Sequence, residues 1–370
     1  MKHAQTTAEI DLARLRHNLS VIQDLVGDCR ILAVVKANGY GHGVTTMLPA
    51  LDDFPDLFLG VATVDEAIEI RRAGGRHDVL IMGLTDAEGI DEALLNNCSL
   101  TIFRPEMLPL IESHAATLGT VANLHVKVDT GMTRLGVRMA ELDSFLASLD
   151  HMPHLTVEGI FSHLVDSSNA DNDLNFVQEK ALTQAVAKVR GAFPDLRYVH
   201  LANSGGTLNF PGFRYDMVRV GILPLGIYPP GYKGGDIDVT PILTLASEVI
   251  DAHRVPAGTG VGYSHSYETK GETAIIVLPI GYADGYPRKL GNRAHVLFRG
   301  KRRPVVGNVS MDYITVDVGD ESDIQIGERA TIIGRDGAEE VTATELAELS
   351  DTIVYEIICG LGRRIARVPV

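Results

Sequence analysis

The chain has 370 residues, of which 45% are apolar and 22% charged, and its formal net charge is −15 at pH 7. That length is ample for one large domain and a smaller one. The acidic balance argues against nucleic acid as a partner, because the one basic cluster, RGKRRP at 299–304, is short enough to be a solvated hairpin. No apolar run reaches the roughly 18–20 residues that a membrane span requires, so we expect no membrane partner.

The N-terminal segment MKHAQTTAEIDLARLRHNL has no apolar core of the kind found in secretory signals, so we expect a cytoplasmic protein. The three cysteines, Cys29, Cys98 and Cys359, are isolated within apolar segments. Their odd number and wide spacing fit buried free thiols and do not fit a disulfide framework or a zinc site. We therefore expect no metal.

In the first 230 residues, short apolar or β-branched runs alternate with segments of helical periodicity. The clearest helices are expected at 64–74, which ends at a glycine, and at 172–193. Eight strands are expected, at 31–36, 57–63, 79–83, 99–103, 124–129, 157–164, 198–204 and 217–226. This count over about 220 residues predicts an α/β fold, a (β/α)8 TIM barrel at 9–234. An open doubly wound sheet is the weaker alternative, because no G-x-G-x-x-G follows the first strand.

The pattern changes at the Pro- and Gly-rich stretch PPGYKGGDID. Beyond it, apolar runs such as TAIIVLPIGYADGY are joined by Gly and Asp turns, which predicts a mostly antiparallel β domain at 235–370. One helical segment is expected within it, at 342–351. Residues 1–8 are expected to join this second domain.

In a TIM barrel the active site forms at the C-terminal ends of the strands, so polar residues at those ends are the candidates for chemistry. The first predicted strand ends at Lys36, and Tyr40 follows it. Further polar residues come at the ends of four other strands: Lys127 and Arg134, Ser162 and His163, Ser204, and Arg219. A single such residue often only braces a barrel. Polar groups from five strands together favour a site.

The apolar run ILAVVK that ends at Lys36 raises the question of why a lysine closes a buried strand. A buried amine loses its proton more readily, and it can then attack an aldehyde to form a Schiff base. The Gly-containing segments after the seventh and eighth strands are suited to bind phosphate through backbone N–H groups. Together these features suggest pyridoxal phosphate. The residues alone leave open a rim lysine whose stem packs while its amine reaches water.

The segment AVVKANGYGHG around Lys36 resembles the cofactor-lysine motif of the alanine racemases. The resemblance continues in the family's order through AEIDLARLRHNL, KVDTGMTRLGVR, HLANSGGTL, VRVGI, GVGYSHSY, IGYADGYPR, VGNVSMDYITVDV and YEIICGLGRRIARVPV. It implies an isomerase with a pyridoxal 5'-phosphate barrel, a C-terminal β domain and a homodimer with shared active sites. In bacteria, this family supplies D-alanine for peptidoglycan in the cell wall.

By this resemblance, Lys36 holds the cofactor and then acts as one of two bases, handling the D-alanine proton. Tyr263, acting from the other subunit, resembles the second base and handles the L-alanine proton. His163 and Arg219 are implied to favour its phenolate. Arg219 is also implied to face the pyridine nitrogen. Because an arginine can only donate there, the ring nitrogen stays unprotonated, and racemisation is favoured over transamination or decarboxylation.

The resemblance also assigns groups that bind the phosphate and the substrate. It implies that Tyr40, Ser204 and the backbone N–H groups of Gly221 and Ile222 bind the phosphate of the cofactor. Arg134 and the backbone N–H of Met311, the latter from the partner subunit, are implied to bind the carboxylate of the amino-acid substrate.

Three further residues are assigned supporting roles by the resemblance. Lys127 is similar to a lysine that is often carbamylated in the family. The alternative is that Lys127 is unmodified and lies beside Asp129 or Arg134. Tyr282 and Asp312 match positions that line the family's substrate entrance. A packing pair between the two domains is the alternative for them.

Two positions depart from the family pattern. Arg363 stands where many members carry a tyrosine near the phosphate, and His265 lies in SHSY, where a small polar pair is usual. Strict alanine preference is therefore open, and a racemase of broader specificity, or one for serine or lysine, is the alternative. A non-catalytic pyridoxal phosphate-binding barrel is a third reading, which the GVGYSHSY segment in a second domain argues against.

Overall fold

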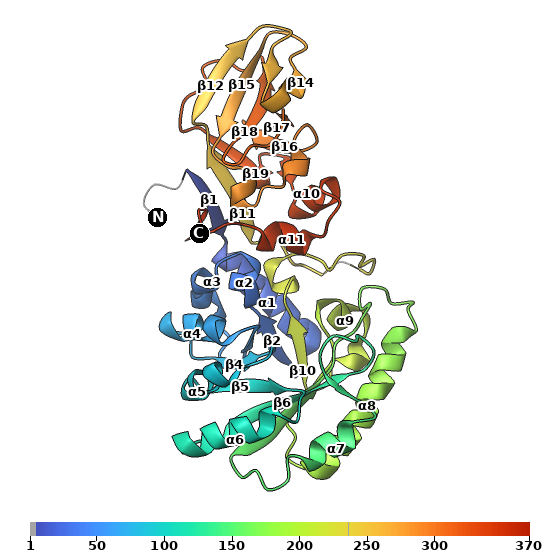
Figure 1. Cartoon of the computed structure of the whole chain (residues 1–370). Helices are drawn as coiled ribbons and strands as arrows, with labels where there is room; N and C mark the ends of the chain where they lie inside the picture. The colour runs from blue at the N-terminus through green and yellow to red at the C-terminus, as the bar shows by residue number, and fades with distance from the viewer. Residues whose placement is uncertain (1–4, 236) are drawn as a thin grey trace. The chain divides into compact units, whose positions relative to one another are not determined.

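The computed structural model describes residues 5–235 and 237–370. They form two compact units, coloured along the chain in Figure 1. The first, here called the barrel unit, comprises residues 13–39 and 48–240. The second, here called the β unit, comprises residues 5–12, 40–47 and 241–370.

Eight parallel strands of the barrel unit form a nearly closed barrel. In spatial order they are β10 (Met217–Val220), β2 (Arg30–Val34), β3 (Phe58–Val61), β4 (Asp78–Ile81), β5 (Cys98–Ile102), β6 (Ala122–Asp129), β8 (Leu155–Phe161) and β9 (Tyr198–His200). A parallel bridge between Asn203 and Arg219 links the last strand to the first. The short strand β7 (Val137–Arg138) pairs with β6 outside this order. The predicted TIM barrel is confirmed, and each predicted run overlaps one of the eight strands.

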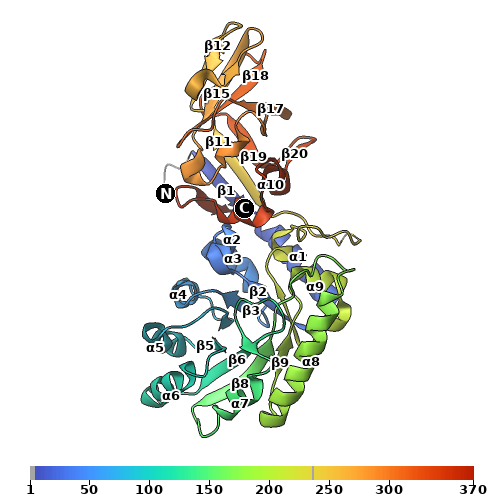
Figure 2. The same cartoon turned by 45° about the vertical axis from the view of Figure 1, so that its right-hand side comes forward.

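Helices cover the outside of these strands (Figure 2). They are α1 (Leu12–Val26), α3 (Val44–Leu51), α4 (Val64–Arg72), α5 (Ala87–Leu95), α6 (Met107–Leu118), α7 (Leu142–Ala147), α8 (Leu174–Ala192) and α9 (Ser204–Asn209). In α4 the Thr63 side chain accepts the Glu66 N–H at the start, while Arg71 and Arg72 complement the helix dipole at the end. Its residues Ala67, Ile68 and Ile70 are buried. This helix and α8 confirm the two predicted helical segments.

The β unit is built on a ten-stranded, mostly antiparallel sheet, as predicted. Its strands are β12 (Asp251–Val255), β15 (Thr273–Leu278), β18 (Ile314–Gly319), β17 (Lys301–Val306), β16 (His295–Phe298), β19 (Arg329–Asp336), β11 (Leu243–Glu248), β1 (Thr6–Ile10) and β21 (Ala366–Pro369), with β20 (Glu339–Val341) paired to β19. The pairing of β1 with β21 is parallel. A separate two-stranded ribbon joins β13 (Gly260–Val261) to β14 (Tyr267–Glu268). Residues 1–4 of the predicted N-terminal contribution lie outside the described residues.

The described residues of 235–370 contain two α-helices where one was predicted. The expected one is α10 (Ala343–Leu349), and the second is α11 (Val354–Cys359). Packing of the buried residues Ile357 and Ile358 stabilises α11. A segment this short and rich in β-branched residues shows no helical periodicity in the sequence. None of the three cysteines forms a disulfide, but only Cys98 is buried, while Cys29 is partly buried and Cys359 is exposed, so the expectation of three buried thiols was wrong for Cys29 and Cys359.

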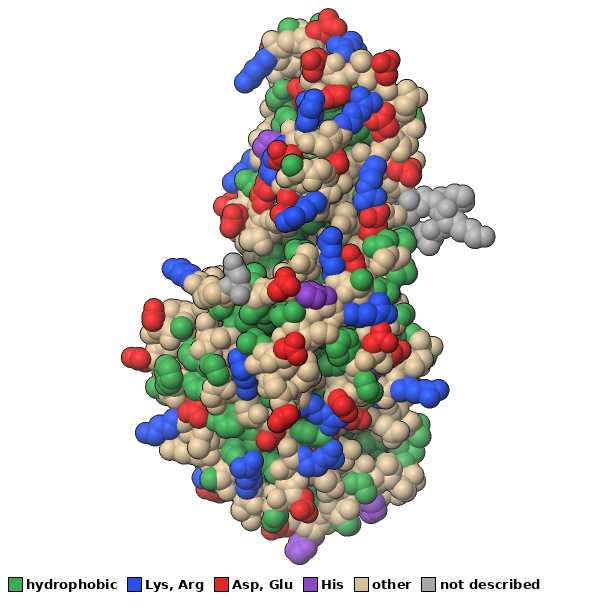
Figure 3. Space-filling model, turned by 180° about the vertical axis from the view of Figure 1, so that it is seen from behind, with side chains coloured by type: hydrophobic (Ala, Val, Ile, Leu, Met, Phe, Trp, Pro, Cys, Tyr) green, Lys and Arg blue, Asp and Glu red, His purple; other side chains and the backbone are tan. Residues whose placement is uncertain are grey.

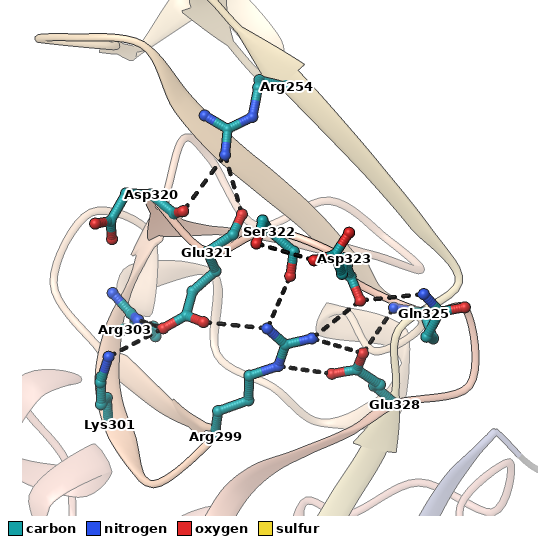
Figure 4. Close-up of polar contacts among 10 residues, drawn as sticks. All are labelled: Arg254, Arg299, Lys301, Arg303, Asp320, Glu321, Ser322, Asp323, Gln325 and Glu328. Atoms are coloured by element: carbon teal, nitrogen blue, oxygen red, sulfur yellow. Dashed lines mark hydrogen bonds and ion pairs between the residues drawn. The ribbon is translucent and has the colours of Figure 1, made fainter.

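On the face shown in Figure 3, Lys and Arg are interspersed with Asp and Glu. Three residues of the basic cluster at 299–304 share one acidic partner, since Arg299, Lys301 and Arg303 all contact Glu321 (Figure 4). Within the described residues, no helix is both long and apolar enough to cross a bilayer.

Glu321 is the hub of this charged cluster, and its side chain is only 14% exposed. Arg299 Nη1 and Lys301 Nζ each donate to it at 3.1 Å, and Arg299 also pairs with both oxygens of Glu328. Hydrogen bonds, first that from Lys301, hold the pKa of Glu321 below its ordinary value of 4.5. Removing this carboxylate leaves three cations without their common partner.

We expect Glu321→Gln to lower the free energy of unfolding by about 1–2 kcal/mol at neutral pH. Because the pKa of the folded carboxyl is depressed, its contribution is present above the ordinary glutamate pKa and is lost as the pH falls through the folded pKa. Thermal melts of both proteins at neutral and at acid pH measure this. Glu248→Gln, at an exposed position of β11, is the matched control. A difference between wild type and Glu321→Gln that is unchanged in acid would contradict the ion-pair explanation.

Candidate cofactor and substrate site

One residue, Val35, separates β2 from Lys36, which begins the short segment α2 (Lys36–Tyr40). The next three residues have left-handed backbone angles: φ is 52° at Ala37, 55° at Asn38 and 62° at Gly39. Only glycine adopts this conformation without cost, and each of the other residues is strained by about 1–2 kcal/mol. The strained turn places a partly buried Lys36 at the C-terminal end of the barrel, as predicted.

Glu66, in the first turn of α4, braces the turn after Lys36. Its Oε1 accepts the Ala37 N–H at 2.6 Å, and its Oε2 accepts the Ala62 N–H at 2.7 Å. The sequence analysis missed this residue. The available signal was a carboxylate in the first turn of the helix that follows β3. Because β3 pairs with β2, that turn lies beside the end of β2, where Lys36 follows.

Arg219, on β10, is buried and held by five hydrogen-bond contacts. Its Nη2 donates to the carbonyls of Ser162 at 2.6 Å and Leu201 at 3.1 Å, and its Nη1 donates to the His200 carbonyl at 2.9 Å. The Nδ1 atoms of His163 and His200 lie 3.2 Å from Nη2 and Nη1. Burial lowers the pKa of Arg219 to about 9, which still leaves it protonated at neutral pH. These contacts use only the terminal nitrogens, so the Nε–H is the donor left to face another acceptor.

Lys127, on β6, is buried with its Nζ 4.3 Å from the centre of the Phe161 ring. Burial, and then the positive charges of Arg219, Arg134 and Lys36, lower its pKa to about 7. These four cationic side chains therefore lie close enough to influence one another, although they come from two strands, the segment α2 and a loop. The structure thus brings together these four of the predicted site residues. Among them, Arg134 is exposed to solvent.

His163, after β8, joins this group. Burial, followed by the charges of Arg219 and Lys127, keeps the pKa of its imidazole well below the ordinary value. It is therefore neutral at physiological pH, and its Nδ1 accepts from Arg219, because a guanidinium can only donate.

Ser204, Gly221 and Ile222 lie together beside this group. The Gly221 N–H donates to the buried Ser204 Oγ at 3.1 Å, and Ile222 is also buried. The backbone is closely packed here, since a Cβ on Gly205 would lie 2.7 Å from the Ser167 hydroxyl. Such a cradle of hydroxyl and backbone N–H groups suits the oxygens of a phosphate.

The chemistry of these groups fits pyridoxal phosphate. Cationic side chains, a hydroxyl and backbone N–H donors suit a dianionic phosphate, and a lysine among them suits an aldehyde. Among residues 5–235 and 237–370, no cluster of three or more His, Cys, Asp or Glu side chains could hold a metal ion.

The remaining predicted residues lie in the β unit. Tyr40 has its ring 6.0 Å from that of Tyr355. Tyr263 begins the 3-10 turn η3 (Tyr263–His265) and is 72% exposed, with its carbonyl accepting from Asn308 at 2.9 Å. His265 is exposed and has a positive φ of 43°.

Tyr282, Met311 and Asp312 also come together in the β unit. The Tyr282 N–H donates to the Ser310 carbonyl at 3.1 Å, and Tyr282 and Met311 are both about half exposed. Asp312 accepts from Arg364 Nη1 at 2.8 Å. This arginine was missed by the sequence analysis.

Arg364 holds two loops of the β unit together. Besides its bond to Asp312, its Nε donates to the buried Asp284 at 2.7 Å. The sequence analysis singled out its neighbour Arg363, whose side chain is exposed. No local pattern distinguishes two adjacent arginines, so only the fold reveals which one is paired.

Three buried polar residues beneath Arg219 were also missed: His125, Glu158 and His200. His125 precedes Lys127 by two residues on β6, so both point to the same side of the strand. That spacing was the available signal, and it would have placed His125 inside the barrel.

Comparison with known proteins places the whole chain in one group. The family model described as "Alanine racemase, N-terminal domain" matches residues 10–229, and "Alanine racemase, C-terminal domain" matches residues 242–369. An alanine racemase of Symbiobacterium thermophilum is 39% identical over 364 residues, covering 98% of this chain and 96% of that protein.

Solved structures agree with this relationship. The alanine racemase of a D-cycloserine-producing Streptomyces lavendulae has a TM-score of 0.94 at 31% identity, covering 100% of this chain and 97% of its own. That of Bartonella henselae, described with covalently bound pyridoxal phosphate, has a TM-score of 0.88 at 27% identity, covering 100% of both chains.

Proposed function

We propose, since this chain belongs to the alanine racemase family, that it interconverts L-alanine and D-alanine as a pyridoxal phosphate-dependent isomerase. The observation that carries the proposal is the group formed by Lys36, Lys127, Arg134 and Arg219 at the barrel rim. Ser204 and Gly221 add a hydroxyl and a backbone N–H beside it. In the cytoplasm the product would be D-alanine for peptidoglycan.

Lys36 would attach the cofactor, while Tyr40, Ser204, Gly221 and Ile222 would bind its phosphate. The cofactor supplies an electron sink that makes the Cα proton of a bound amino acid acidic. Arg219 would offer its Nε–H to the ring nitrogen, because its terminal nitrogens are already occupied by carbonyls and histidines. As an obligate donor it keeps that nitrogen unprotonated, which limits the sink and favours racemisation.

Two residues would move the Cα proton. Lys36 Nζ would take or return it on one face, as the base for D-alanine, and Tyr263 Oη on the other, as the base for L-alanine. Tyr263 is 72% exposed in the single chain, which suits a residue that completes the site of a second subunit. The site would then be shared within a homodimer.

Arg134 and the backbone N–H of Met311 would bind the substrate carboxylate. Met311 is 52% exposed, so it is available to a second subunit in the same way as Tyr263. Tyr282 and Asp312 lie on the two loops joined by the hydrogen bond from the Tyr282 N–H to the Ser310 carbonyl. They would line the substrate entrance. Arg364 fixes Asp312 and so would stabilise that entrance.

The proposal is tested by supplying the purified chain with pyridoxal phosphate and L-alanine and following D-alanine by a chiral assay. Comparison of kcat/KM for L-alanine, L-serine and L-lysine then tests the substrate. A visible cofactor band without D-alanine would keep the cofactor and move the substrate to another amino acid. Failure to bind the cofactor would sink the proposal.

Lys127 would carry a carbamate. Its pKa of about 7 leaves much of the amine neutral at neutral pH. A neutral Nζ attacks carbon dioxide, an N–C bond forms, and one proton leaves to solvent. The resulting anion would lie among Arg219, Arg134 and Lys36 and would orient Arg134 toward the substrate.

We expect the intact protein to gain the mass of one carbon dioxide above about pH 7 and to lose it as the pH falls and the amine protonates. Lys127→Met should abolish the gain and raise KM for alanine about tenfold, through misplacement of Arg134. Mass spectrometry under native conditions and steady-state kinetics measure the two effects. Lys188→Met, which removes a partly exposed lysine paired with Asp143, is the control. If the Lys127→Met protein still gained the mass of one carbon dioxide, the carbamate would have to lie on another amine.

A further inference from the structure

Beneath Arg219, a line of buried polar side chains runs through the barrel interior. Arg219 Nη1 lies 3.2 Å from His200 Nδ1, and His200 Nε2 lies 2.9 Å from His125 Nδ1. His125 Nε2 lies 3.2 Å from Glu158 Oε1, which also accepts from Ser99 Oγ at 2.5 Å. These groups come from β10, β9, β6, β8 and β5, and all are at most 6% exposed.

The two ends of this line together fix the direction of every bond in it, because a guanidinium can only donate and the ionised carboxylate of Glu158 can only accept. Arg219 can only donate, so His200 Nδ1 must accept. A neutral His200 then carries its proton on Nε2 and donates to His125 Nδ1. His125 in turn carries its proton on Nε2 and donates to Glu158. The line is therefore a one-way relay from a cation to a carboxylate.

The electrostatics of the barrel interior agree with this order. Burial, and then the charge of Arg219, hold the pKa of His200 well below its ordinary value, so this imidazole is neutral. Burial opposes ionisation of Glu158, but hydrogen bonds from His125 and Ser99 outweigh it and hold the pKa of Glu158 below its ordinary value. The relay thus ends on a charged carboxylate.

The fold reserves space for the relay. A Cβ on Gly159 would lie 2.2 Å from His125 Nδ1, so only glycine leaves room for this ring. His200 stacks on Phe161, with ring centroids 4.7 Å apart and planes 12° apart, and His125 lies parallel to Tyr198 at 5.9 Å. The two imidazoles therefore have fixed orientations as well as fixed partners.

We propose that Glu158 is a positioning residue: through His125 it fixes His200 as the tautomer that accepts from Arg219. This keeps the Arg219 Nε–H available to the ring nitrogen of the cofactor. The inference rests on the proposed function for its catalytic consequence, but the tautomers belong to the protein alone. Glu158 thereby influences reaction specificity although His125 and His200 separate it from Arg219.

The test uses Glu158→Gln, which keeps an oxygen for His125 but removes the charge. Nitrogen-15 NMR of the histidine side chains in the full chain, with and without pyridoxal phosphate, reads the tautomers directly. We expect His125 and His200 in the wild type to be protonated at Nε2 only. In Glu158→Gln the His125 Nε2 proton should shift upfield, because a neutral acceptor forms a weaker bond.

In the holoenzyme, Glu158→Gln should lower kcat about tenfold with KM for alanine unchanged, and raise transamination relative to racemisation. Glu112→Gln is the matched control, because it removes another histidine-paired carboxylate, that of His154. If Glu158→Gln fails to fold, Ser99→Ala removes one hydrogen bond from the same carboxylate and should act in the same direction.

Protonation of His200 at Nδ1, or at both nitrogens, would overturn the relay. So would an unaltered ratio of transamination to racemisation in Glu158→Gln or, where that variant does not fold, in Ser99→Ala. A wild-type chain without racemase activity would instead sink the proposed function and leave the tautomer result standing. The two failures are therefore distinguishable.

Discussion

Replacing Lys36 by alanine is expected to lower kcat/KM for alanine by at least about 10³-fold, because one side chain supplies both the cofactor attachment and one of the two bases. The fold should survive the change. Lys36 lies outside the positive-φ positions of its turn, so alanine fits the backbone there. The turn itself is held by Glu66, which accepts the Ala37 N–H, a backbone group that the substitution does not change.

Steady-state racemisation and the visible spectrum of protein supplied with pyridoxal phosphate measure the effect of Lys36→Ala. Lys188→Ala serves as the control, since that lysine pairs with Asp143 on the outside of the barrel. A Lys36→Ala protein that racemises alanine at the wild-type rate would disprove the assignment of the cofactor lysine. Circular dichroism separates that outcome from loss of the fold.

Tyr263→Phe is expected to lower kcat about 10²–10⁴-fold in both directions, because racemisation needs a proton carrier on each face. The substitution removes one oxygen from a side chain that is 72% exposed, so stability should be unaffected. The Cα hydrogen of D-alanine, handled by Lys36, should still exchange with solvent deuterium. Exchange from L-alanine should be lost. Tyr313→Phe, at an exposed tyrosine of the β unit, is the control.

Exchange rates for the two enantiomers, followed by NMR in deuterated water, test the Tyr263 assignment directly. Equal loss of exchange from both would mean that Tyr263 supports the site without carrying the L-alanine proton. Full racemase activity in Tyr263→Phe would end the two-base interpretation.

A mixture of the two inactive variants then tests the shared site. If Lys36 and Tyr263 of one site come from different subunits, a mixed dimer of Lys36→Ala and Tyr263→Phe contains one complete site. Random exchange makes about half the dimers mixed, so about a quarter of the wild-type activity should return. If both residues act within one chain, the mixture stays inactive.

Much of the fold was determined by local patterns in the sequence. Apolar runs at regular spacing gave all eight barrel strands and the antiparallel domain, because burial of alternating or continuous apolar residues decides strand formation. The helix α11 escaped this reasoning, because its six residues are fixed by burial of Ile357 and Ile358 and not by periodicity.

The candidate site was predicted only as a list of residues at strand ends. Sequence order placed Lys36, Lys127 and Arg219 at one rim, because parallel strands share a direction. It did not reveal that Arg219 is held by carbonyls of Ser162 and His200, or that Arg364 and not Arg363 binds Asp312.

The sequence by itself therefore determined the elements, their order and the type of chemistry at the rim. Tertiary structure alone decided which polar groups meet. His125 and His200 are 75 residues apart and Arg219 lies beyond both, yet closing the barrel brings them into one hydrogen-bonded line. A local pattern records which face a side chain occupies, whereas its partner is set by the register and closure of distant strands.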